Sequence, residues 1–166
     1  MIPGLSTAAF TLTHVILSLV GIGSGFVVAF GLLTARRLPF WTALFIASTA
    51  LTSLTGFLFP FHGMTVSLEM EIPTLAVLML AAVGLYGRKL AGAWRDTYVV
   101  SIMVALYFSV FVLVEQLFTR FLPPTTRAPN RPGLVLEFTQ FAVFAAFVLL
   151  TRLAQKRFRG TAGHRL

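Results

Sequence analysis

The sequence predicts an all-α membrane protein: a bundle of five transmembrane helices with its N-terminus outside and its C-terminus in the cytoplasm. Of the 166 residues, 57% are hydrophobic and only 11% are charged, whereas a soluble domain carries about 25% charged residues. Apolar stretches long enough, or nearly long enough, to cross a bilayer recur five times. The charges are also divided: ten of the thirteen Lys and Arg residues fall at one set of helix ends and four of the five acids at the other.

The five predicted spans have the length that a bilayer requires. A hydrocarbon core about 30 Å thick needs roughly 20 apolar helical residues. The connections between the stretches are too short for a separate soluble domain, so residues 1–166 are predicted to form a single integral membrane domain. The predicted spans are about 11–34, 40–60, 68–87, 97–119 and 134–153, followed by a basic cytoplasmic tail over 154–166.

The first span carries small residues at spacings of three and four, a pattern that lets two helices approach closely in lipid. We expect this stripe to pack against another helix. The segment before it, Met1 to Phe10, has no Lys or Arg, and the apolar run is longer than that of a signal peptide, so we expect a retained span. The helix-packing stripe consists of Ser18, Gly21, Gly25 and Ala29.

The second span carries Ser48, Thr52 and Thr55 on one face, and the fourth span carries Ser101, Ala105 and Ser109, so both have a face suited to helix contacts. Pro60 is predicted to end the second span, because the residue before a proline is pushed out of helical geometry.

The third span is the weakest of the five by composition, because Glu69 and Glu71 lie near its start. The positive-inside rule decides in its favour. With five spans, ten basic residues share the cytoplasmic side; without the third, the split becomes five against eight, which the rule disfavours. Trp41, Tyr86, Trp94 and Tyr98 then fall at the cytoplasmic boundary, as interfacial aromatic residues do.

Every span contributes a polar or ionisable group at the outer side. His14 shares the face of the small-residue stripe and is expected to face protein. Ionisable residues within spans indicate a candidate functional site, although structural hydrogen bonds or pairing of the acids with Arg120 or Arg127 would also account for them. Glu69 and Glu71 suit a helix N-terminus, where the helix dipole favours acids. The candidate ligand-binding residues are His14, His62, Glu115, Gln116, Glu137 and Gln140.

This group of residues permits three chemistries, none of them marked by a specific spacing. His14 and His62 could ligate the iron of a haem b if they faced each other. Histidine and carboxylates together could hold a divalent metal. His14 with Gln116 and Gln140 could instead hydrogen-bond the head group of a quinone.

Several classes of function are excluded or disfavoured. The chain has no cysteine, which excludes disulfides, thiolate metal sites and c-type haem. It carries none of the common hydrolase, metalloprotease or phosphate-binding motifs. The predicted midplane is almost wholly apolar, unlike that of a transporter. The basic residues stand in short groups beside apolar runs, so we expect no nucleic-acid binding despite the net charge of +8.

Three segments resemble a group of small, uncharacterised bacterial integral membrane proteins: residues 13–22, residues 51–63 with their TSLTGFLFPFHG-type motif ending the second span, and residues 105–116. The resemblance runs from the first span to the fifth and implies a bacterial inner (cytoplasmic) membrane location. The chain departs from the group's pattern at Ser109, where asparagine is usual, and in the more acidic stretch Ser67 to Ile72.

The leading functional hypothesis is a non-catalytic membrane protein that acts as an accessory or interaction subunit of a larger membrane assembly. Its expected partners are the lipid bilayer and either other membrane subunits or further copies of itself. The alternative is a redox or ligand-binding protein that uses the outer-side residues. An enzyme or transporter is the third and least supported hypothesis.

Overall fold

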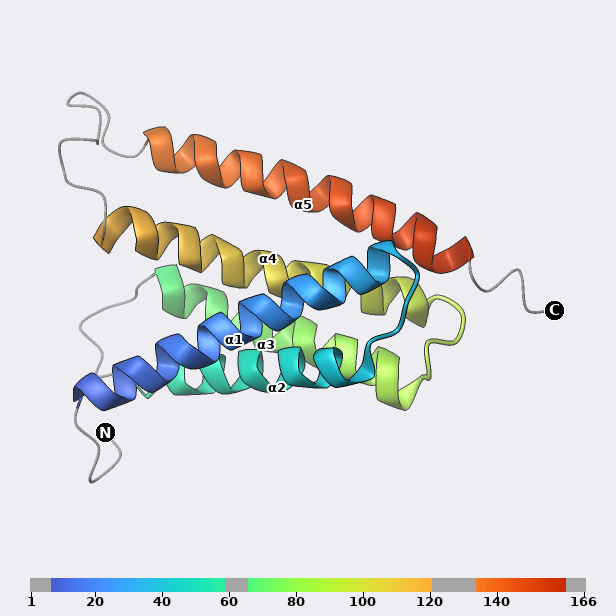
Figure 1. The fold of residues 1–166 in the computed structure, drawn as a ribbon, viewed down its shortest axis with the longest axis horizontal. Helices are drawn as coiled ribbons and strands as arrows, with labels where there is room; N and C mark the ends of the chain where they lie inside the picture. The colour runs from blue at the N-terminus through green and yellow to red at the C-terminus, as the bar shows by residue number, and fades with distance from the viewer. Residues whose placement is uncertain (1–6, 59–65, 121–133, 161–166) are drawn as a thin grey trace.

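The computed structural model describes residues 7–58, 66–120 and 134–160, and in these residues the chain forms five α-helices that run side by side in one bundle (Figure 1). Four of the helices are long and apolar enough to cross a membrane, namely all except α2. The predicted all-α class is confirmed, and the helices have the length and composition of a multi-pass membrane protein. The elements are α1 (Thr7–Leu33), α2 (Pro39–Gly56), α3 (Val66–Ala82) with its π-helical continuation η1 (Val83–Gly87), α4 (Trp94–Arg120) and α5 (Leu134–Gly160).

The helix that falls short in apolarity is α2, whereas composition had pointed to the third span. The acids of α3 lie at its start, so the stretch Glu69–Gly87 remains apolar overall. Hydroxyl residues instead recur along the whole of α2, and Thr42, Ser48, Thr49 and Ser53 are buried. Ser48 donates a hydrogen bond to the carbonyl of Leu44 one turn earlier, at 2.6 Å. Such local bonds let hydroxyl side chains sit inside an apolar bundle.

Three helix ends differ from the predicted spans by four residues or more, and one of them is the start of α1, at Thr7 instead of about 11. α2 ends at Gly56, before the predicted end at 60, and the Leu58 amide donates to the Thr55 carbonyl in a tighter turn at 3.0 Å. α5 continues to Gly160, past the predicted end at 153. The basic segment is rich in good helix formers, and Ala154 and Phe158 are buried against the bundle, which extends the helix.

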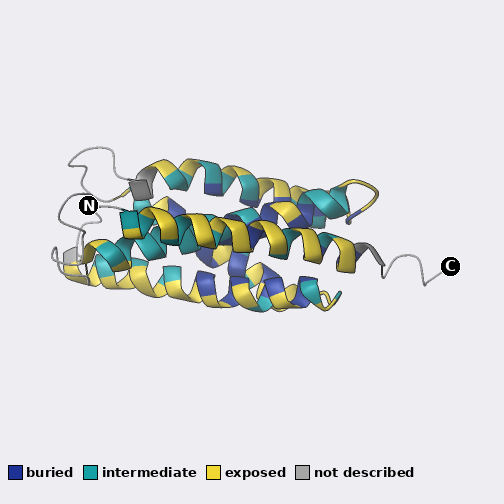
Figure 2. Ribbon diagram, turned by 90° about the horizontal axis from the view of Figure 1, so that it is seen from above, coloured by how far each residue is buried: buried dark blue, intermediate teal, exposed yellow. Residues whose placement is uncertain are grey.

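α5 is the least embedded helix in the bundle. It packs on α4 and α1 at the edge of the bundle (Figure 1). When the bundle is viewed with α5 in front, most of the α5 ribbon is coloured as exposed or intermediate (Figure 2). In its apolar stretch 6% of the residues are buried, against 44% for α1.

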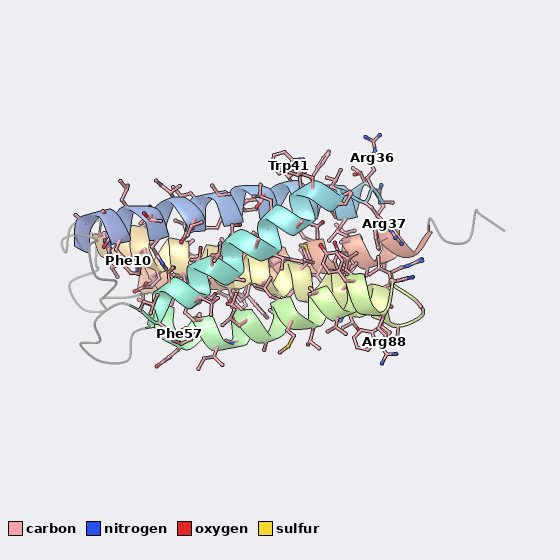
Figure 3. The ribbon with its side chains drawn as sticks, turned by 90° about the horizontal axis from the view of Figure 1, so that it is seen from below. Phe10, Arg36, Arg37, Trp41, Phe57 and Arg88 are labelled. Atoms are coloured by element: carbon pink, nitrogen blue, oxygen red, sulfur yellow. The ribbon has the colours of Figure 1, made fainter. Side chains whose placement is uncertain are left out.

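The two ends of the bundle differ in chemistry. Arg36, Arg37 and Arg88 gather at one end, whereas Phe10 and Phe57 lie at the other (Figure 3). We call these the arginine end and the far end. The sequence had placed the basic and acidic groups on opposite sides, and the helix arrangement carries the connections 34–38 and 88–93 to the arginine end (Figure 1).

The closely packed core lies in the half of the bundle nearest the arginine end. Val28, Phe45, Leu78, Ile102 and Leu106 are among its buried side chains, contributed by four helices. These residues come from the second half of α1, the middle of α2, the second half of α3 and the first half of α4. Towards the far end, the residues of α1, α4 and α5 are mostly half-buried or exposed.

The small residues of α1 allow its close contact with α2 and α4. A Cβ atom added at Gly21 would lie 2.9 Å from Thr49 Oγ1, and one added at Gly25 would lie 2.6 Å from Leu106 Cδ1 and 2.8 Å from Phe45 Cε2. Gly21, Gly25 and Ala29 are buried, and Ser18 is half-buried. A larger residue at Gly25 would therefore have to displace core side chains.

The connection 88–93 closes the arginine end. Leu90 turns inward with φ +58° and is 2% exposed, and its amide donates to the Gly84 carbonyl at 2.9 Å. The Arg88 guanidinium lies over the Trp94 ring, 5.4 Å from its centroid. Tyr98, near the start of α4, is buried: its hydroxyl lies 3.4 Å from Thr42 Oγ1 of α2 and its ring packs within the core.

Candidate functional site

His14 joins α1 to the last turn of α2 at the far end. Its Nδ1 lies 2.9 Å from the Oγ1 of Thr55. The Thr55 hydroxyl also lies 2.8 Å from the carbonyl of Leu51 and 2.9 Å from that of Thr52, so its single proton is given either to one of these carbonyls or to the imidazole. In the first case the histidine carries its proton on Nδ1. His14 faces protein, as its position on the stripe of α1 predicts.

Glu71 joins α3 to the same turn of α2. Its carboxylate accepts a hydrogen bond from the buried hydroxyl of Ser53. A Cβ atom added at Gly56 would lie 2.7 Å from Glu71 Oε1, so the absence of a side chain there gives the carboxylate its space. The last turn of α2 thus contacts a histidine on one neighbouring helix and a carboxylate on the other.

A second set of polar contacts joins α4 to α5. Gln140 Nε2 donates to the carbonyl of Phe111 at 2.9 Å. Gln116 Oε1 accepts from Arg120 Nε at 2.8 Å, one turn along the same helix. These two glutamines therefore serve the packing of α5 on α4 and the last turn of α4.

Two side-chain oxygens beside these contacts accept no hydrogen bond from the described chain. Glu115 Oε2 and Gln140 Oε1 are buried atoms with no hydrogen-bond partner among the described residues. Buried acceptors of this kind carry a desolvation cost of about 1–3 kcal/mol each when nothing donates to them. Among the far-end groups, these two oxygens are the ones best able to accept a hydrogen bond from a bound molecule.

The remaining candidates lie elsewhere. Glu69 and Glu137 are exposed. His62 lies outside the described residues, so its relation to His14 stays a prediction. Over residues 7–58, 66–120 and 134–160, no three His, Asp or Glu side chains come together in a group that could hold a metal ion.

Sequence reasoning missed the pairing of Ser53 with Glu71 and of Thr55 with His14. It assigned Glu71 to the start of a helix and Thr55 to a packing face; Thr55 does face a neighbouring helix, whereas only Glu69 lies in the first turn of α3 and Glu71 follows it. The sequence does not show how far α1, α2 and α3 are shifted relative to one another along the bundle axis. The run of hydroxyls at the end of α2, opposite a histidine and a carboxylate on its chain neighbours, is the signal that could have suggested the pairing.

The far-end residues can therefore be divided by what they do. His14, Glu71 and Gln140 form hydrogen bonds between helices. Glu115 and one oxygen of Gln140 have acceptor capacity left over within the described part of the chain. Comparisons with known proteins found no match to this chain among family models, curated proteins or solved structures.

Proposed function

We propose that this chain is a non-catalytic integral membrane protein that acts as an accessory or interaction subunit of a larger membrane assembly. In this proposal all five helices cross a bacterial inner membrane, with the N-terminus outside and the arginine end in the cytoplasm. The positive-inside rule supports that orientation. α2, with 18 residues, is about 27 Å long at 1.5 Å per residue, close to the hydrocarbon thickness.

The observation that carries this proposal is the uncovered face of α5, which we define by Phe138, Phe141, Ala142, Ala146 and Leu149. All five residues are exposed. Ala142 and Ala146 stand one turn apart, the spacing that lets helices pack closely in lipid. On α1 the small residues of the equivalent stripe are covered by α2 and α4, whereas on α5 nothing in the described chain covers them.

The far-end contacts support a non-catalytic role. His14 and Glu71 would be the natural catalytic groups, and each is hydrogen-bonded to a hydroxyl of α2. Hydrogen bonds between membrane helices stabilise the bundle by about 0.6 kcal/mol on average. A structural role thus accounts for these two residues without a substrate.

The proposal is tested by extracting the protein from its native membranes in a mild detergent and recording native mass spectra. We expect a complex with a second protein, lost in Ala146→Leu because the larger side chain blocks the close approach of a partner helix. Ala47→Leu is the matched control, since Ala47 is an exposed alanine on α2. A protein extracted alone and monomeric, or a complex weakened equally by both substitutions, would contradict the proposal.

A second candidate function, ligand binding at the far end, is favoured by the two acceptors without donors, Glu115 Oε2 and Gln140 Oε1. A molecule with hydroxyl donors, such as a quinol head group, would satisfy them. We would extract the purified protein with organic solvent and measure quinone, and record the visible spectrum for haem. Quinone retained by the wild type and lost in Gln140→Leu supports this function, and a preparation with neither group removes it.

A further inference from the structure

An open groove lies between α4 and α5, away from the far-end polar groups. Its volume is about 500 Å³, within the range of about 300–1,000 Å³ typical of small-molecule sites. Met103, Val104 and Tyr107 of α4 and Phe144, Phe147 and Val148 of α5 line most of it. The groove is thus mainly apolar and runs along the two helices.

One end of the groove is polar and lies towards the arginine end. Thr151, Arg152 and Gln155 of α5 complete the lining there. Arg152 is exposed and forms no ion pair with an acid of the described chain, so its guanidinium donors can meet a ligand. An apolar channel with a cation and an amide at its mouth matches a molecule that has a hydrocarbon chain and an anionic head.

The groove has the length of part of an acyl chain. From Phe144 to Gln155 its lining runs along α5 for about 16 Å at 1.5 Å per residue. Apolar side chains line most of that length, and the charged Arg152 stands near one end. A lipid with an anionic head group requires this order of apolar and cationic lining.

We propose that this groove is a binding site for one anionic phospholipid. An acyl chain lies between α4 and α5 against Val104, Tyr107 and Val148, and the phosphate accepts hydrogen bonds from Arg152 and Gln155. A lipid in this site would add contacts between α4 and α5, the helix with the smallest buried share among the four long apolar helices. It also gives Arg152 a specific role, different from the general attraction of the basic helix end to anionic head groups.

Native mass spectrometry of the full chain in mild detergent tests the proposal, with phosphatidylglycerol and phosphatidylcholine of identical acyl chains as probes. We expect the wild type to bind one phosphatidylglycerol about five- to tenfold more tightly than phosphatidylcholine, the effect expected of one charged hydrogen-bonding group. Arg152→Gln should remove this preference. Val148→Trp, which fills the groove, should weaken the binding of both lipids.

Arg157→Gln is the matched control, because Arg157 is an exposed arginine of the same helix that does not line the groove. It should keep the preference of the wild type. Arg152 is exposed, so its substitution removes charge without opening a cavity. The proposal is overturned if the wild type binds both lipids equally, or if Arg157→Gln and Arg152→Gln weaken binding alike. It is also overturned if the chain forms a dimer that carries no bound lipid.

Discussion

The arginine end and the far end of this bundle belong to the same helices but are held together in different ways. Near the arginine end, Gly25 brings α1 against Phe45 and Leu106, and large side chains fill the space between four helices. Near the far end the helices meet through single hydrogen bonds, such as that between His14 and Thr55. Packing fixes the first region, and a few polar contacts position the second.

This difference has a consequence for function. In lipid, close packing and hydrogen bonds between helices replace the hydrophobic drive that stabilises soluble cores. A region that depends on a few hydrogen bonds can open or exchange partners at small cost, whereas a packed region cannot. The far end is therefore where the helices can separate most easily, and the packed core near the arginine end is the fixed part of the protein.

The largest expected effect is the loss of a core side chain near the arginine end. Phe45 is fully buried, so Phe45→Ala should lower the free energy of unfolding by about 3–5 kcal/mol, through the cavity left among α1, α2 and α4. The measurement is equilibrium unfolding in mixed micelles. Phe141→Ala is the control, since Phe141 is 71% exposed, and should change stability by less than about 0.5 kcal/mol. Equal losses in the two variants would remove the distinction between a packed region and a lipid-facing one.

A somewhat smaller effect is expected from overpacking α1. Gly25→Ala should cost about 1–3 kcal/mol, because the added Cβ would meet Leu106 and Phe45 at less than contact distance. Gly23 has nothing within 4 Å of an added Cβ, so Gly23→Ala should stabilise the helix by about 0.5–1 kcal/mol. The same unfolding measurement compares them. A stable Gly25→Ala protein would show that α1 is not held closely against its neighbours.

The smallest effect belongs to the far end. A double-mutant cycle of His14→Ala and Thr55→Val should give a coupling energy of about 0.6 kcal/mol, the average for a hydrogen bond between membrane helices. The cycle His14→Ala with Thr97→Val is the control, because Thr97 bonds locally, to the carbonyl of Ala93 just before α4, near the arginine end. A coupling energy of several kcal/mol would mean that the far end is as firmly fixed as the core.

The sequence is sufficient to predict the features that depend on one helix at a time. The apolar stretches predicted the helices, and the spacing of Gly21 and Gly25 predicted a contact face. Features that depend on the relative height and angle of two helices could not be predicted. The partner of His14, the bond between Ser53 and Glu71, and the groove between α4 and α5 are of this kind.

Tyr98 shows the same limit. Its place near the start of α4 predicts its level along the bundle but not the direction in which its ring faces, and the ring is 4% exposed. Position along one helix gives depth in the membrane, but only the neighbouring helices decide whether a side chain faces lipid or protein. Thr42, which lies beside the tyrosine hydroxyl, comes from α2.

The central claim is that α5 presents its uncovered face to a partner protein, and photo-cross-linking in native membranes tests it most directly. A photoreactive phenylalanine analogue is placed at Phe141 on that face, or at Phe30 of α1, which is 67% exposed and serves as the lipid-facing control. We expect a single defined protein adduct from position 141 and none from position 30. No protein adduct from position 141, or the same adducts from both positions, would contradict the claim.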